Sequence, residues 1–143
     1  MPKTILLIDD DRDDREFFCH AIAKVSDSIC IALDDGNLML PKIKSGEIER
    51  PDIIFLDVNM PQMNGWECLS LLKQNNDYKD IPVVMYSTTK HKEEAAKAKA
   101  LGALYFFTKP SDFSVLKKGL ADLIEHLLND KLDVLSQNSS LFR

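Results

Sequence analysis

Short runs of apolar residues alternate along the chain with segments of helical character. Five runs are uniformly apolar, without intervening polar positions: Ile5–Ile8, Ile29–Leu33, Ile53–Leu56, Val83–Tyr86 and Leu104–Phe107. Uniform runs of this length are typical of strands buried on both faces of a sheet. Helical segments follow them, at residues 13–25, about 38–44, 66–74, 92–101 and 112–128. The pattern therefore predicts five repeats of a strand followed by a helix.

This alternation predicts the α/β class. Successive strands of one sheet that are joined through helices are connected by right-handed crossovers, which makes the strands parallel and places helices on both faces. We expect a five-stranded parallel sheet, doubly wound, with a (βα)5 arrangement. In the last segment, apolar residues recur every three or four positions from Phe113 to Leu127 and form a stripe that faces the sheet, with Ser111 as the predicted N-cap.

One domain accounts for residues 1–128, and residues 129–143 form a tail that is too short for a second domain. Leu128, Leu132 and Leu135 continue the helical spacing. The tail is therefore predicted either to extend the last helix, packing on the domain or on a second copy in a homodimer, or to be a disordered end.

Composition and charge narrow the possible partners. Lys plus Arg total 18 and Asp plus Glu total 23, a net charge of −5, so nucleic acid is disfavoured because it selects basic surfaces. We find neither a signal-peptide pattern nor the roughly 18 consecutive apolar residues of a membrane span, and predict a cytoplasmic protein. Cys19, Cys30 and Cys68 are far apart in sequence without a Cys-x-x-Cys pair, so we interpret them as reduced thiols in or near the core.

Polar residues follow the apolar runs where functional side chains are expected. In open α/β sheets, ligands bind outside the carboxyl ends of the strands. Asp9 and Asp10 follow the first run and Asp57 follows the third. Ser87 follows the fourth, and Lys109 comes just after the fifth. Three carboxylates, a hydroxyl and an ammonium group are therefore predicted to meet at one edge of the sheet.

Other acidic residues in these turns have simpler structural interpretations. Asp11, Asp13 and Asp14 stand at the start of the first helical segment, where caps and the helix dipole favour anions. Asp34 and Asp35 precede a glycine, a common turn sequence. Neither role accounts for the aspartate and the lysine that close the third and fifth runs.

The predicted cluster has the components of phosphoryl transfer. Clustered carboxylates repel one another, and oxygen ligands without His or Cys favour Mg²⁺ as the ion that relieves the repulsion. Asp57 would be the nucleophile and form an aspartyl phosphate, with Lys109 and the ion neutralising the phosphoryl oxygens and Ser87 donating a hydrogen bond to one of them. Water can hydrolyse this acyl phosphate, so the modification would be transient.

Four motifs in order resemble the response-regulator receiver domain of two-component signalling. They are Ile-Asp-Asp at 8–10, Leu-Asp-Val-Asn-Met-Pro-Gln-Met-Asn-Gly at 56–65, Tyr-Ser-Thr at 86–88 and Thr-Lys-Pro at 108–110. The resemblance covers about residues 3–128. It implies a flavodoxin-like strand order of 2-1-3-4-5, and a phosphoryl donor that is a phosphohistidine on a sensor histidine kinase or a histidine phosphotransfer protein.

The resemblance also implies roles for individual residues. Asp57 would be the phosphoacceptor and a metal ligand, Asp10 a direct ligand, Asp9 a ligand through water, and the backbone carbonyl of Asn59 a further ligand. Lys109 would pair with the phosphoryl group, through a loop in which the peptide bond to the following proline is cis.

Two positions depart from the commonest receiver pattern. The hydroxyl position holds Ser87 where Thr is frequent, and the aromatic switch position holds Phe106 where Tyr is frequent. Serine retains the donor, whereas Phe106 has no hydroxyl, so a switch at this position would depend on packing alone. An ordinary core aromatic is the alternative interpretation of Phe106.

These observations predict a single-domain response regulator that is not a turnover enzyme and signals by phosphorylation-dependent binding to a downstream protein. One alternative is a small Mg²⁺-dependent phosphatase of the haloacid-dehalogenase type, with Asp9 as nucleophile and Asp11 as acid. Arg12 and Asp13 do not match what that family has after its second aspartate. The other alternative is a receiver-like scaffold that takes no phosphate.

Overall fold

The computed structural model describes residues 2–89 and 91–128 and confirms the strand–helix alternation. The strands are β1 (Thr4–Ile8), β2 (Ile29–Leu33), β3 (Ile53–Asp57), β4 (Val83–Ser87) and β5 (Tyr105–Thr108). The helices are α1 (Arg12–Val25), α2 (Met39–Ser45), α3 (Gly65–Lys73), α4 (Lys92–Ala100) and α5 (Phe113–Leu128), with a short 3-10 turn, η1 (Gly36–Leu38), before α2. The predicted tail at 129–143 and its dimer contact lie outside the described residues.

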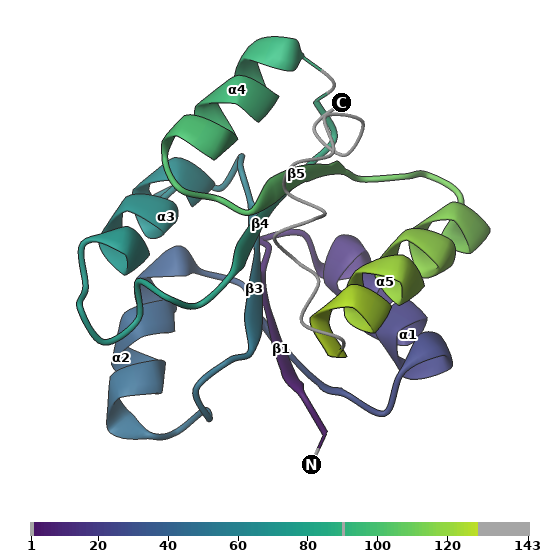
Figure 1. Ribbon diagram of the computed structural model, residues 1–143, viewed down its shortest axis with the longest axis horizontal. Coiled ribbons are helices and arrows are strands. Elements are labelled where there is room, and N and C mark those ends of the chain that lie inside the picture. Colours follow the sequence, from purple (N-terminus) through teal and green to yellow (C-terminus); the bar gives the residue numbers. More distant parts are fainter. Residues whose placement is uncertain (1, 90, 129–143) are drawn as a thin grey trace.

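The five strands form one parallel sheet in the order β2-β1-β3-β4-β5, which confirms the order implied by the family resemblance. Helices α1 and α5 cover one face, and α2, α3 and α4 cover the other (Figure 1). The order reverses direction at β1, so the carboxyl ends of β1 and β3 flank the crevice where doubly wound proteins bind ligands.

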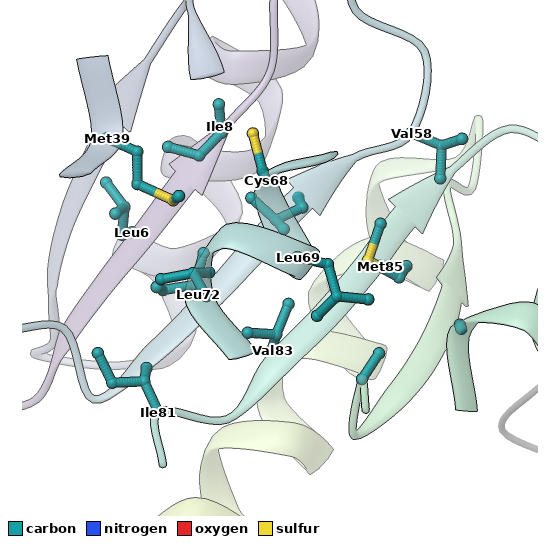
Figure 2. Packing of buried hydrophobic residues seen from close by; sticks show 14 of the residues in the cluster. Leu6, Ile8, Met39, Val58, Cys68, Leu69, Leu72, Ile81, Val83 and Met85 are labelled. Atoms are coloured by element: carbon teal, nitrogen blue, oxygen red, sulfur yellow. The ribbon is translucent and has the colours of Figure 1, made fainter. Parts of the chain in front are cut away.

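Each face of the sheet has its own core, because successive residues of a strand point to opposite faces. On the α1/α5 side, Phe18, Phe55 and Tyr86 are fully or almost fully buried and pack edge to face. On the other side, Leu6, Ile8 and Val83 share one core with Met39 of α2 and Leu69 of α3 (Figure 2). Strands β1, β3 and β4 are buried along their whole length, as their uniformly apolar sequences predict. The same expectation is wrong for β2, which lies at an edge of the sheet and is only partly buried.

The helix starts were predicted less well than the strands. Asp11 caps α1 by accepting from the Asp14 amide at 3.0 Å, and Asp35 caps η1, so both turn roles are confirmed. The predicted N-cap of α5, Ser111, is wrong. Asp112 accepts from the amides of the second and third helical residues instead, because α5 begins one residue later than expected.

Helix α4 contacts the sheet through small side chains. Its buried residues are Ala95 and Ala98, while its lysines and glutamates lie largely outside the core. Buried alanines remove little apolar area from water compared with the leucines of α3 or α5, so less free energy holds α4 to the domain. No helix within the described part of the chain is long and apolar enough to cross a membrane.

Candidate functional site

The sheet register brings Asp9 and Asp57 side by side. Ile8, the last residue of β1, pairs with Leu56 on β3, so the residues that follow them, Asp9 and Asp57, lie at the same level at the carboxyl edge. Asp9 is fully buried and Asp57 is 5% exposed, whereas Asp10 faces solvent. Two carboxylates therefore lie within the protein and the third lies at the opening.

These three aspartates fit a divalent cation. One carboxylate oxygen from each of Asp9, Asp10 and Asp57 lies within 4.8 Å of the others. A site with few carboxylates, no nitrogen or sulfur ligand and an open side for water suits a hard cation that keeps part of its hydration shell. The donor set thus agrees with the metal chemistry expected from the sequence.

The positively charged side chain of Lys109 lies at this edge, beside the aspartates. Its Nζ donates to Asp9 Oδ2 at 2.7 Å and to Asp14 Oδ2 at 2.9 Å, and lies 3.4 Å from Asp57 Oδ1. The Lys109 side chain is 8% exposed. Its backbone amide donates to the carbonyl of Ser87 at 2.7 Å, which continues the β4–β5 pairing and fixes the start of the side chain.

The buried charges shift the pKa values of the acceptor and the lysine. Burial, followed by the negative charge of Asp9, raises the pKa of Asp57 to about 7, and Lys109 offsets only part of this shift. Burial acts to lower the pKa of Lys109, but hydrogen bonds to Asp9 and Asp14 outweigh it and the net pKa is raised. The lysine is thus held as a cation, while the Asp57 carboxylate lacks full charge compensation.

The oxygens of Asp9 have partners within the domain. Oδ1 accepts from the Asp11 amide at 3.0 Å while Oδ2 holds Lys109, and the backbone carbonyl of Asp9 accepts from Arg15 Nη1 at 2.9 Å. The Asp11 carboxylate is occupied with capping α1. Asp9 and Asp11 are therefore structural and electrostatic partners of the edge in this arrangement.

The remaining predicted site residues lie around this cluster. Ser87 is fully buried at the end of β4, and its Oγ accepts from the Thr89 amide at 3.3 Å. Phe106 is 1% exposed, in the same core as Ala95 and Ala98 of α4. Asn59 is exposed in the loop after β3. We call the carboxyl edge with Asp9, Asp10 and Asp57 the acidic edge. Strands β4 and β5 lie between this edge and α4.

A glycine allows α3 to start against the end of β3. A Cβ placed on Gly65 would lie 2.3 Å from the backbone oxygen of Asp57, a distance no side chain tolerates. The Gly65 amide donates to Val58 at 3.0 Å, and Asn64 and Glu67 form a capping box. The loop that follows Asp57 is thus fixed at both ends, and its residues 60–63 line a cavity of about 220 Å³ with Asp34 and Asp35.

Two features of the site differ from the sequence-based expectation. Asp14 was expected only to favour the start of α1, yet it is one of the carboxylates that hold Lys109. Its position in the first turn was visible in the sequence, but its contact with a residue ninety-five positions away was not. The bond between Lys109 and Pro110, expected to be cis, is trans in the structure, the isomer favoured for X–Pro by about 0.5–1 kcal/mol.

The fold and the site define a doubly wound α/β protein with an aspartate cluster that fits a divalent cation at the switch point of its sheet. A family model described as the response regulator receiver domain matches residues 5–121. The chain belongs to this family. Receiver domains of the family bind a divalent metal at an aspartate cluster, interact with histidine kinases and downstream targets, and are generally not turnover enzymes.

Relatives and solved structures agree with this assignment. Response regulator Rcp1 of Synechocystis sp. is 34% identical over 123 residues, covering 82% of this chain and 83% of Rcp1. Protein PilG of Pseudomonas aeruginosa is 32% identical over 106 residues, 74% of this chain and 76% of PilG. The crystal structure of the phosphorylated cyanobacterial phytochrome response regulator RcpA has a TM-score of 0.81 with 26% identity, covering 90% of this chain and 95% of RcpA. The Mn²⁺-bound form of Rcp1 has a TM-score of 0.75 with 31% identity, covering 87% and 93%.

Proposed function

We propose that this chain is a response regulator that accepts a phosphoryl group on Asp57 from a phosphohistidine, in a Mg²⁺-dependent reaction. The donor would be a sensor histidine kinase or a histidine phosphotransfer protein. The observation that carries the proposal is the placement of Asp57: a nearly buried carboxylate at the end of a central strand, 3.4 Å from the Lys109 ammonium and clustered with Asp9 and Asp10. Its counterpart Asp9 is already engaged on both oxygens.

In this reaction, a carboxylate oxygen of Asp57 attacks phosphorus while the phosphorus–nitrogen bond to imidazole breaks. The imidazole nitrogen takes a proton from solvent as it leaves, and the product is an acyl phosphate. No separate base is needed because the ionised carboxylate is itself the nucleophile. The chain's contribution is position and charge, as in other phosphoryl transfers.

Different residues of the acidic edge would bind the metal ion and the phosphoryl group. Asp9, Asp10, Asp57 and the backbone carbonyl of Asn59 would hold Mg²⁺, which supplies charge neutralisation for the phosphoryl oxygens when bound. Lys109 would turn from its contacts with Asp9 and Asp14 toward the new phosphoryl group, since the group develops additional negative charge beside it. The hydroxyl of Ser87 would donate to a phosphoryl oxygen.

The response would reach partners through β4, β5 and α4. Moving Ser87 toward the phosphoryl group shifts the loop after β4, which precedes α4, and Phe106 packs in the same core as the alanines of that helix. With phenylalanine in place of tyrosine, the change would be one of packing. The output we propose is altered binding of a downstream protein, without turnover chemistry of its own.

The geometry gives less support to the two alternatives. A phosphatase of the haloacid-dehalogenase type would need Asp9 free to attack and Asp11 free to act as acid, but Asp9 is buried and bonded on both oxygens and Asp11 caps α1. A receiver-like scaffold without phosphate chemistry would not need Asp57, Lys109 and the acidic pair to be kept together.

Phosphoramidate, which carries a phosphorus–nitrogen bond like phosphohistidine, provides the test. Intact-mass analysis of the chain after incubation with phosphoramidate and Mg²⁺ should show one added phosphoryl group. None should be added when EDTA is present from the start. Asp57→Asn should take none, whereas Asp9→Asn should still take some. A phosphoryl group that persists in Asp57→Asn, or that is lost only in Asp9→Asn, would favour the phosphatase, and no phosphoryl group in any form would favour the scaffold.

A further inference from the structure

Two cysteines that are eleven positions apart in sequence meet on the α1 side of the sheet. Cys19 on α1 and Cys30 on β2 have their Sγ atoms 2.8 Å apart, well inside the contact distance of two non-bonded sulfur atoms. Both thiols are free and both residues are half-buried. We propose that Cys19 and Cys30 are a reversible disulfide site, oxidised by low-molecular-weight disulfides such as oxidised glutathione.

The geometry requires little movement for this bond. A disulfide has its sulfur atoms about 2.05 Å apart, so the Sγ atoms of Cys19 and Cys30 need to approach by less than 1 Å. Strand β2 forms an edge of the sheet, and neither Cys19 nor Cys30 is fully buried. A small reagent can therefore approach this part of β2 from the open edge.

The surroundings also make one of the two thiols reactive. The hydrogen bond from Cys30 lowers the pKa of the Cys19 thiol, burial acts in the opposite direction, and the positive charge of Arg15 lowers it further, with a net decrease. The thiolate is the attacking species in thiol–disulfide exchange. Cys19 is thus the attacking residue and Cys30 the resolving one.

The reaction is a two-step exchange that balances. The Cys19 thiolate attacks one sulfur of oxidised glutathione, forming a mixed disulfide and releasing one glutathione thiolate. Cys30, after losing its proton, attacks Cys19 Sγ, forming the Cys19–Cys30 bond and releasing the second glutathione. The two protein thiols lose two electrons, the glutathione disulfide gains them, and the two protons pass to the released glutathiones.

The third cysteine provides a matched control. Cys68 lies fully buried in the core on the other face of the sheet, where burial raises the pKa of its thiol to about 12. It has neither the low pKa nor the sulfur neighbour of Cys19. Only the Cys19–Cys30 pair is therefore expected to respond.

The bond would join the middle of α1 to the edge strand β2. Disulfides in reducing compartments are usually transient and often sense redox state, which is the behaviour proposed for this half-buried pair. Closing a loop of this length is expected to raise Tm by roughly 5–10 °C. Helix α1 also carries Asp14, which holds Lys109, so the bond would restrain one partner of the acidic edge.

In the test, the full chain is incubated with excess oxidised glutathione, and its intact mass is measured without reductant. The remaining free thiols are then alkylated and the linked peptides are mapped. Wild type and Cys68→Ala should each lose the mass of two hydrogen atoms, regain it with dithiothreitol, and yield a peptide pair linked through Cys19 and Cys30. Cys30→Ser should stop at a glutathione adduct on Cys19, whereas Cys19→Ser, which lacks the attacking thiol, should form neither an internal bond nor a comparable adduct. Asp57→Asn should behave as wild type, so this inference can fail or succeed independently of the proposed phosphoryl transfer.

Several results would overturn the proposal. One is a wild-type protein that keeps three alkylatable thiols under conditions in which urea-unfolded protein is fully oxidised. Others are a stable glutathione adduct without an internal bond, a bond that involves Cys68, and an oxidised form that melts below the reduced one.

Discussion

Replacing Asp57 by asparagine should stabilise the metal-free protein at alkaline pH, because the ionised, buried Asp57 carboxylate lowers the free energy of unfolding. Burial and the charge of Asp9 raise the pKa of Asp57 from 3.8 to about 7 in the folded state. The folded state therefore binds a proton more tightly than the unfolded state. The penalty is absent below the unfolded pKa, grows between pH 4 and 7, and is complete above the folded pKa.

The magnitude follows from the size of the shift. A shift of about three units at about 1.4 kcal/mol each gives an upper bound of ~4 kcal/mol for the penalty above pH 7. Lys109 stands 3.4 Å away and the edge can relax, so a gain of about 1–3 kcal/mol for Asp57→Asn at pH 8 is the expected range. Asparagine does not titrate, and the gain should shrink by about half or more by pH 5.

Urea unfolding with EDTA at pH 5, 6, 7 and 8 measures this difference, and comparing the two proteins at each pH cancels the titration of groups that do not interact with Asp57. Asp27→Asn, at an exposed aspartate outside the acidic edge, is the control and should leave the free energy of unfolding nearly unchanged at every pH. Adding Mg²⁺ should reverse the order, because a ligand at 100 times its Kd stabilises wild type by ~2.7 kcal/mol and the asparagine variant by less. The reasoning is refuted if Asp57→Asn is no more stable at pH 8, or if its advantage is the same at pH 5.

Three further substitutions test other parts of the edge. Asp10→Ala should abolish most of the Mg²⁺-induced rise in Tm while changing the metal-free Tm little, since Asp10 is exposed; an undiminished rise would exclude it as a ligand. Lys109→Ala should lower the free energy of unfolding by about 3–5 kcal/mol in urea titrations, because Asp9 and Asp57 lose their cation. If it folds, it should still be phosphorylated by phosphoramidate, but amide exchange in α4 should no longer respond; an equal response in variant and wild type would contradict the coupling role. Gly65→Ala should cost about 1–3 kcal/mol in the same titration, as its Cβ meets the Asp57 carbonyl, and a neutral result would show that α3 can shift freely.

The strands and their polar ends could be predicted because their causes are local to the sequence. Strand β3, Ile53–Asp57, is buried on both faces. Its uniformly apolar run and the aspartate that ends it could therefore both be recognised from the sequence. The edge at which Asp9, Asp57 and Lys109 meet follows from parallel topology alone. Uniformly apolar runs do not show which neighbour each strand pairs with. The strand order was therefore predicted from the family resemblance.

The remaining features depend on distances that sequence patterns do not encode. The contact of Asp14 with Lys109 requires the orientation of α1 against the loop after β5. Cys19 and Cys30 looked like separate core thiols because their spacing matches no metal or redox motif, yet α1 packs against β2 and brings them together. Ser111 and Asp112 are neighbouring capping residues, and the sequence does not show which of them caps α5; in the structure Asp112 accepts from the Ser114 and Val115 amides.

The alanine contacts of α4 set how strongly a small event at the acidic edge can change the molecule's surface. Because α4 is held by Ala95 and Ala98, we expect it to open locally at a lower free energy than α3 or α5 and to have a larger minority of the detached form. In such an equilibrium, each ~1.4 kcal/mol that the proposed rearrangement of Lys109 or Ser87 would supply would change the ratio of the two forms tenfold. A leucine-rich α4 would start from a much smaller detached population and would need more energy to reach the same final population. In the proposed response, the short alanine side chains would therefore set the sensitivity.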